Sequence, residues 1–115
     1  MSNDAAEWFR TRLSDDLRAA FAARDRAAIR TLRCIMAAID NAGAVAVDAN
    51  ATHAASSTEV PRKPLSEPEI VAILQAEIVA RARVADEYER RGNAVQAGEL
   101  RHEIATIQPL TALLR

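Results

Sequence analysis

Aromatic residues are scarce in this chain, at 3% of 115 residues, whereas apolar residues of all kinds make up 50%. With so few rings, the core must be filled by alanine and branched aliphatic side chains, which suits close-packed helices. Strand-forming residues are also sparse, because no run of alternating Val, Ile, Thr or Tyr occurs. The sequence therefore predicts an all-α fold, organised as a single domain over residues 1–115.

Potential metal ligands are equally few. Cys34 is the only cysteine, which excludes an internal disulfide and a thiolate metal cluster. His53 and His102 have no second ligand at a suitable spacing, so we expect neither a metal site nor a cofactor.

No stretch approaches the roughly 20 apolar residues that span a bilayer, and the first residues do not resemble a secretion signal. We therefore expect no membrane association and a cytoplasmic location.

Charge of one sign does not dominate the chain, whose formal net charge is −1. Lys63 is the only lysine, so nearly all of its cations are arginines. A strongly basic domain would attract nucleic acid or anionic lipid over its whole surface, and this chain lacks that property. Any such binding must come from a local cluster of cations.

Apolar residues recur at spacings of three and four, and they predict four helices, over about residues 4–23, 26–42, 66–91 and 93–108. Gly43 is expected to end the second helix, and Pro109 to end or kink the fourth. Short connections make neighbouring helices antiparallel, as αα-hairpins. Residues 44–64 are polar and without periodicity, which predicts a flexible loop. The expected fold is a four-helix-bundle-like domain of two αα-hairpins joined by this long loop.

The third helix has an unusually complete start signal. Ser66 is the expected N-cap and Glu69 follows three residues later, which together form a capping box. Pro68 lies in the first turn, where its missing N–H costs nothing. Gly92 is expected to stop this helix, and Asn93 to cap the next one.

A charged pair lies within the apolar stripe of this third helix. Glu77 and Arg81 are one turn apart on the face that Ile70 and Leu74 direct toward the core. Because an unpaired buried charge costs several kcal/mol, the two must pair with each other or with neighbouring helices. Glu103 and Arg33 flank the stripes of their own helices, so we expect one buried network of Arg33, Glu77, Arg81 and Glu103. Such a network either fixes helix register or lines a ligand groove.

Four arginines are close together at the start of the second helix. Arg26, Arg30 and Arg33 lie within about 60° of one another, with Arg24 at the foot of the helix. This row is a candidate surface for RNA phosphates or for a partner protein. The alternative, which the frequency of charged helix flanks favours, is a solvated flank paired with acidic residues such as Asp25 and Asp40.

A series of residues, taken in order, carries a resemblance to a known family. They are Arg24, Asp25, Thr31, Leu32, Arg33, Ala37, Ala38, Ile39, Asn41, Ala42, Leu65, Ser66, Glu67, Glu69, Ile70, Leu74, Gln75, Glu77, Ile78, Arg81, Tyr88, Glu89, Gly92, Glu99, Glu103 and Ile104. Their order and spacing resemble the YqeY-like (GatB/YqeY) family, over most of the chain outside the loop.

The resemblance implies an N-terminal helical domain related to the tail region of the B subunit of the glutamine-dependent aminoacyl-tRNA amidotransferase. In that enzyme the tail helps to hold tRNA. Family members carry the label of carbon–nitrogen ligase with glutamine as amide donor, but this chain has none of the kinase-like or amidase machinery that the reaction needs. From the residues after Pro109, we also expect the family's C-terminal tail domain to be absent.

The leading hypothesis is thus a non-catalytic helical module associated with tRNA amidation, which binds tRNA or an amidotransferase. The competing hypothesis is a protein-interaction or assembly module whose charged network is purely structural. An enzyme that acts by itself ranks last. The salt dependence of binding distinguishes the first two hypotheses, because affinity that depends on phosphate contacts falls steeply as salt is added.

Overall fold

The structure is a computed structural model that describes residues 5–48 and 64–114. In this part of the chain the regular elements are α1 (Ala5–Ala22), α2 (Arg26–Asp48), α3 (Glu67–Arg90) and α4 (Ala94–Ala112). The all-α fold that the sequence predicts is confirmed, and all four helices begin within two residues of their expected starts.

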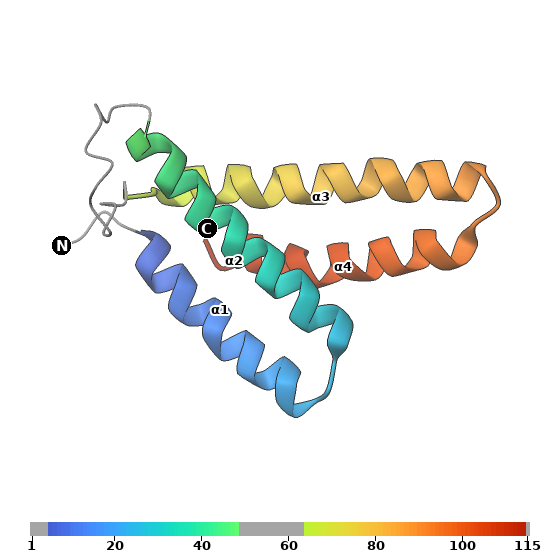
Figure 1. The fold of residues 1–115 in the computed structure, drawn as a ribbon, viewed down its shortest axis with the longest axis horizontal. Coiled ribbons are helices and arrows are strands. Elements are labelled where there is room, and N and C mark those ends of the chain that lie inside the picture. Colours follow the sequence, from blue (N-terminus) through green and yellow to red (C-terminus); the bar gives the residue numbers. More distant parts are fainter. Residues whose placement is uncertain (1–4, 49–63, 115) are drawn as a thin grey trace.

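The four helices form two αα-hairpins, α1–α2 and α3–α4, which diverge from a shared end (Figure 1). The start of α1, the end of α2, the start of α3 and the end of α4 meet there, and the two hairpins extend from it in different directions, so that their tips are far apart. The Cα radius of gyration is 16.2 Å, whereas a compact chain of this length would have about 13 Å. The molecule is therefore an open V, with the core at its vertex.

The core is built from large aliphatic side chains and one phenylalanine. The largest fully buried apolar side chains are Phe9 and Leu13 of α1, Ile35 and Ile39 of α2, Ile70 and Leu74 of α3, and Ile107 of α4. Full burial of a side chain of this size stabilises a fold by roughly 1.5–3 kcal/mol. All four helices contribute, so neither hairpin buries its apolar stripe alone.

The start of α3 has the expected capping box. Ser66 Oγ accepts a hydrogen bond from the Glu69 backbone N–H at 3.3 Å, and the Ser66 N–H donates to Glu69 Oε1 at 2.9 Å. The carbonyl of Leu65 accepts from the Ala5 N–H at 2.9 Å, which joins the start of α1 to the start of α3. At the other end Gly92 has a φ of +80°, and the Asn93 side chain caps α4.

The connection between α1 and α2 is a tight turn at Arg24 and Asp25. Arg24 has a φ of +57°, a left-handed conformation that non-glycine residues rarely adopt. Asp25 Oδ1 accepts from the Ala28 N–H at 3.0 Å and so caps the start of α2.

The expected end of the second helix is wrong, and of the two expectations for Pro109, an end or a kink of the fourth helix, the end is wrong. Helix α2 does not stop before Gly43 but continues to Asp48, and Gly43 is buried inside it. Helix α4 does not stop at Pro109 but continues to Ala112. In each case the added turns lie at the vertex. Beyond Pro109, burial of Leu110 and Leu114 offsets the poor helix propensity of proline, and Gly43 is itself buried where α2 reaches the vertex. The predicted loop 44–64 is accordingly helical over 44–48, and residues 49–63 of it lie outside the described residues.

Candidate functional site

The charged network joins the two helices of the second hairpin. Arg81 Nη1 lies 2.7 Å from Glu77 Oε1, and Arg81 Nε lies 2.9 Å from Glu103 Oε1. The same Nη1 donates to the backbone carbonyl of Glu77 at 3.2 Å. The exposed fraction is 13% for the Arg81 side chain, 33% for Glu77 and 20% for Glu103. One guanidinium therefore bridges two carboxylates across the seam between α3 and α4.

The balance of forces on Arg81 favours its charged form. Burial lowers the pKa of Arg81, but the hydrogen bonds and charges of Glu77 and Glu103 together outweigh burial, so its pKa is raised above the ordinary value. Because the pKa is raised on folding, the stabilisation from this cation is fully present at any pH below the pKa of arginine in the unfolded chain. It is lost only as the pH rises from there through the pKa of the folded state. The bridge consequently keeps its cation at every pH at which a protein of this kind is handled.

Arg33 does not belong to this network, which corrects the sequence prediction. Its guanidinium carbon lies 5.3 Å from the centre of the Phe21 ring of α1, and its side chain is exposed. Asp40, two turns further along α2, bonds Arg10 of α1 at 2.7 Å. The flank of α2 that carries Arg33 thus faces α1, whereas Arg81 lies on the other hairpin.

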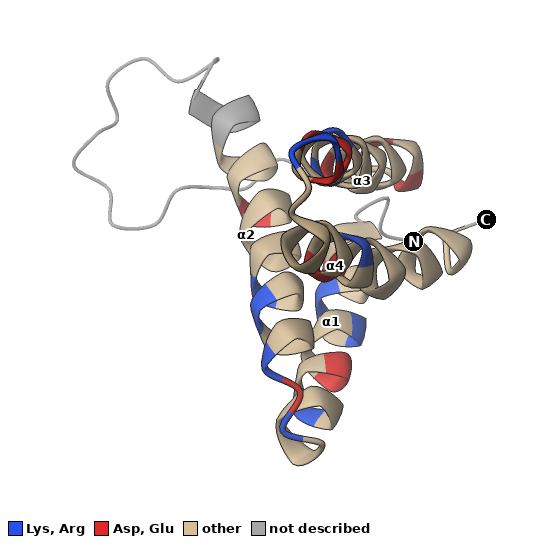
Figure 2. Cartoon of the chain, turned by 90° about the vertical axis from the view of Figure 1, so that its right-hand side faces the viewer, with Lys and Arg blue, Asp and Glu red and all other residues tan. Residues whose placement is uncertain are grey.

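The arginine row, defined as Arg24, Arg26, Arg30 and Arg33, lies on the surface. All four residues are exposed, and the basic segments follow one another along α2 in Figure 2. Within residues 5–48 and 64–114, none of the four lies within 4.0 Å of a carboxylate oxygen. The solvated-flank interpretation expected pairing with Asp25 and Asp40, but Asp25 caps α2 and Asp40 bonds Arg10.

The other arginines of the described chain differ from this row. Seven of them form ion pairs: Arg10, Arg12, Arg18, Arg81, Arg90, Arg91 and Arg101. Arg83 of α3 is exposed and, within the same residues, forms no ion pair. Four of the five arginines that lack a carboxylate partner are therefore concentrated within ten residues of the sequence.

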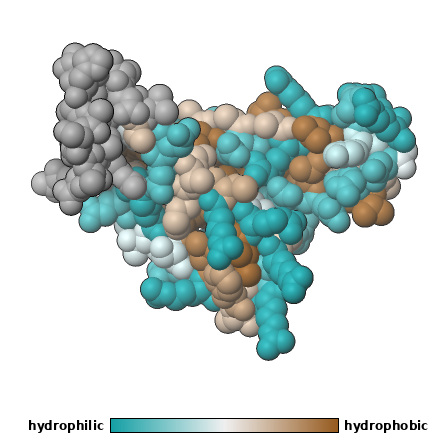
Figure 3. Space-filling view, viewed as in Figure 1, coloured by the Kyte–Doolittle hydropathy of each residue, from teal (hydrophilic) through white to brown (hydrophobic). Residues whose placement is uncertain are grey.

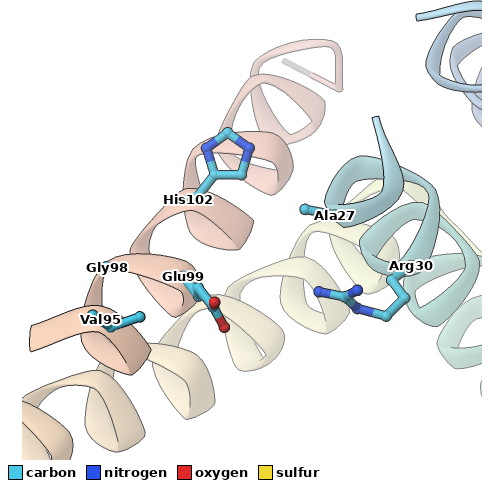
Figure 4. Close-up of a pocket in the computed structure, with 6 residues that line it drawn as sticks. All are labelled: Ala27, Arg30, Val95, Gly98, Glu99 and His102. Carbon is cyan, nitrogen blue, oxygen red and sulfur yellow. The ribbon is translucent and has the colours of Figure 1, made fainter. Parts of the chain in front are cut away.

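A groove that the sequence analysis missed lies between α2 and α4, on the inner side of the V. It has a volume of about 400 Å³ and is lined by Ala27, Arg30, Val95, Gly98, Glu99 and His102 (Figure 4). Arg30 extends from α2 toward α4, where Glu99 and His102 project from successive turns. The only local signal in the sequence was a glycine inside the fourth helix. The facing residues are about 70 positions apart, so no local pattern brings them together.

The remaining exposed aromatic and cysteine residues do not form a cluster in the described part of the chain. Trp8 and Phe21 of α1 are 51% and 52% exposed, and hydrophobic residues on the visible surface alternate with hydrophilic ones (Figure 3). Cys34 is exposed, and His53 lies outside the described residues. Over residues 5–48 and 64–114, no group of three potential ligands is placed to hold a metal ion. Over the same residues, no helix combines the length and the apolar character that crossing a membrane requires.

Comparisons of this chain with family models, curated proteins and solved structures found no match. The resemblance to the YqeY-like family therefore stays a prediction from the residues quoted above.

Proposed function

We propose that this protein is a non-catalytic helical module that binds RNA through the arginine row, in the setting of tRNA-dependent amidation that the resemblance implies. The observation that carries the proposal is the cluster of four exposed arginines that have no carboxylate partner within the described part of the chain. Cations that a fold needs for its own stability are usually paired within it, as Arg81 is. Cations left unpaired in a cluster are available for phosphates.

The distribution of charge supports a local basic surface in a chain of nearly neutral net charge. At the tip of the other hairpin, Asp86, Glu87 and Glu89 are already engaged by Arg101, Arg90 and Arg91. Positive potential is consequently not cancelled evenly over the molecule but remains at the start of α2. Such a patch attracts a polyanion even where the whole protein is close to neutral.

The backbone at Arg24 supports a role for that side chain beyond folding. An L-residue in the left-handed region costs about 1 kcal/mol or more, and glycine is the residue that adopts it without strain. Arginine nevertheless occupies this position, with a φ of +57°. A glycine here would remove the strain, but it would also remove the cation at the end of the row.

The geometry of α2 suits contact with several phosphates of one strand. Arg26, Arg30 and Arg33 follow at intervals of about one turn, and a rise of 1.5 Å per residue places the first and last about 10 Å apart along the helix axis. Arginine also presents a planar fork of donors to phosphate oxygens.

The test is the affinity of the purified chain for labelled tRNA, measured by fluorescence anisotropy at several salt concentrations. With up to four phosphate contacts, we expect the logarithm of the association constant to fall with the logarithm of salt with a slope of about −3. Arg26→Gln should weaken binding and reduce the size of that slope by about 1.

Arg83→Gln is the matched control, because Arg83 is an exposed arginine outside the row that forms no ion pair with any described residue. It should leave both affinity and slope close to those of the parent chain. An equal loss of affinity for tRNA in Arg26→Gln and Arg83→Gln would mean that the attraction is not specific to the arginine row. Binding to an amidotransferase that does not respond to salt, together with no binding to tRNA, would favour the protein-interaction module instead.

A further inference from the structure

The groove between α2 and α4 is continuous with the arginine row, because Arg30 belongs to both. Its volume of about 400 Å³ falls within the range of roughly 300–1,000 Å³ that is typical of sites for small molecules. Arg30 lies at the α2 side of the groove (Figure 4), so a polyanion along the row would pass the mouth of the groove there. The groove is therefore placed to receive a group attached to the phosphate that Arg30 would contact.

Within residues 5–48 and 64–114, the polar side chains that line the groove form no hydrogen bond or ion pair with other side chains. Arg30 and Glu99 lie on opposite walls but do not form an ion pair, and the His102 side chain forms no hydrogen bond within residues 5–48 and 64–114. A cation and a carboxylate that face each other across open space leave room for a ligand that needs both. The apolar members Ala27 and Val95, the latter 72% exposed, provide surface for a flat ring.

Gly98 makes one wall of the groove unusually shallow. Glycine in a helix interior costs about 1 kcal/mol relative to alanine, and a Cβ added here would meet no atom within 4 Å other than those of its own stretch of helix. Packing within the protein therefore does not require glycine at this position. Its effect is to let a planar group approach the α4 backbone closely.

We infer that the groove holds one unpaired nucleotide of the RNA, with its phosphate at Arg30 and an exocyclic amino group of its base donating to Glu99. This inference rests on the proposed function, because it assigns a base-binding site to the same RNA surface. Proteins read single-stranded RNA through bases that stack on side chains such as histidine or arginine and form hydrogen bonds at their edges. His102 and Arg30 are the stacking candidates in this groove.

The position of Glu99 predicts a preference among bases. A carboxylate can only accept hydrogen bonds, and cytosine offers it an N4 amino group. Uracil, which has nearly the same shape, offers an O4 oxygen at that position and so places two acceptors against each other. The groove should therefore favour cytosine over uracil.

The experiment compares labelled oligocytidine and oligouridine of eight nucleotides by anisotropy, at one moderate salt concentration and then across a salt series. The parent chain should bind the cytidine oligomer about tenfold more tightly, the ratio that one good contact to a base edge supplies. Glu99→Gln should reduce this ratio to near 1, because an amide can donate to uracil O4 as well as accept from cytosine N4.

Gly98→Leu tests the groove without removing a charge. The leucine side chain should occupy the groove and abolish the preference, while salt-dependent binding through the row remains. Ala76→Leu is the matched control, since Ala76 is an exposed small residue of α3 outside the groove, and it should keep the tenfold ratio. Thermal melting of each variant checks that the fold is retained.

Equal binding of the two oligomers by the parent chain, with the expected salt slope, would overturn the inference about the groove and leave the proposed function in place. A cytidine preference that survives in Glu99→Gln would also overturn it. Failure of both oligomers and of tRNA to bind at any salt concentration would overturn the inference together with the proposed function.

Discussion

At the scale of the single residue, Arg81 is the clearest example of a charge that the fold uses. It lies on the seam between α3 and α4 and is held by one carboxylate from each helix. Removing one partner from such a site is costly, because the remaining charges lose their compensation but stay partly shielded from water. The ion pairs at the hairpin tip, such as Arg90 with Glu87, are exposed and contribute far less.

Arg81→Ala is expected to reduce the free energy of unfolding by about 2 kcal/mol. A fully buried pair costs roughly 3–5 kcal/mol to break, and the value here is smaller because Glu77 is 33% exposed and can be hydrated. Urea denaturation monitored by circular dichroism measures the change. Arg83 lies two residues further along and forms no ion pair within residues 5–48 and 64–114, so Arg83→Ala should change stability by less than about 0.5 kcal/mol. An equal effect in the two variants would show that the bridge contributes nothing specific.

At the scale of the element, helix ends are decided by two competing influences. Local signals are sufficient where the end lies in solvent, as at the capping box of Ser66 and Glu69 and at Gly92. They are overridden where the end lies against the core, as at Gly43 and Pro109. Burial of a Leu or Ile side chain is worth roughly 1.5–3 kcal/mol, which is enough to extend a helix past one unfavourable residue.

The two described glycines of the second hairpin should respond oppositely to alanine. Gly98→Ala is expected to stabilise the fold by about 0.5–1 kcal/mol, because the added Cβ meets open space within a helix. Gly92→Ala is expected to destabilise it by about 1 kcal/mol, because the turn holds this residue at a φ of +80°. Melting temperatures of the two variants, compared with the parent chain, measure both changes. A loss of stability in Gly98→Ala would mean that α4 is packed more closely there than the structure shows.

At the scale of the whole molecule, stability is concentrated at the vertex of the V. Of the residues between Leu74 and Ile107, all of which the structure describes, only Ala85 and Ala97 are buried. The outer half of the α3–α4 hairpin is therefore held by two buried alanines, by part-buried side chains such as Tyr88 and Leu100, and by the ion pairs of Arg81 and Arg101. The groove lies beside this arm, on the side that faces the start of α2.

Hydrogen exchange should reveal this uneven distribution. Amides of residues 82–100 are expected to exchange at least about tenfold faster than those of residues 68–78 and 104–110, after correction for intrinsic rates, because few buried apolar contacts oppose local opening of the arm. Mass spectrometry of peptic fragments measures the difference. Arg81→Ala should widen it, and uniform protection along α3 and α4 would contradict the expectation.

What the sequence determined by itself is the set of features that depend on neighbours within about one helical turn. The helical period placed four helices, the cap residues fixed the start of α3, and the spacing of Glu77 and Arg81 placed an acid and a base on one face. The pairing of Arg81 with Glu103 was also predicted, but by the same argument from flanking stripes that placed Arg33 in the network, so the sequence alone did not determine it.

Only the tertiary structure decided which faces of different helices meet at the margins of the core. The period shows that a face is apolar, but it does not show which flank lies toward which neighbour. Arg33 was therefore assigned to the wrong hairpin, and the groove between Arg30 and Glu99 was missed. The helix ends at Gly43 and Pro109 were misplaced for the same reason. Each of these outcomes depends on the free energy of packing between segments that are distant in the sequence, and no local pattern carries that information.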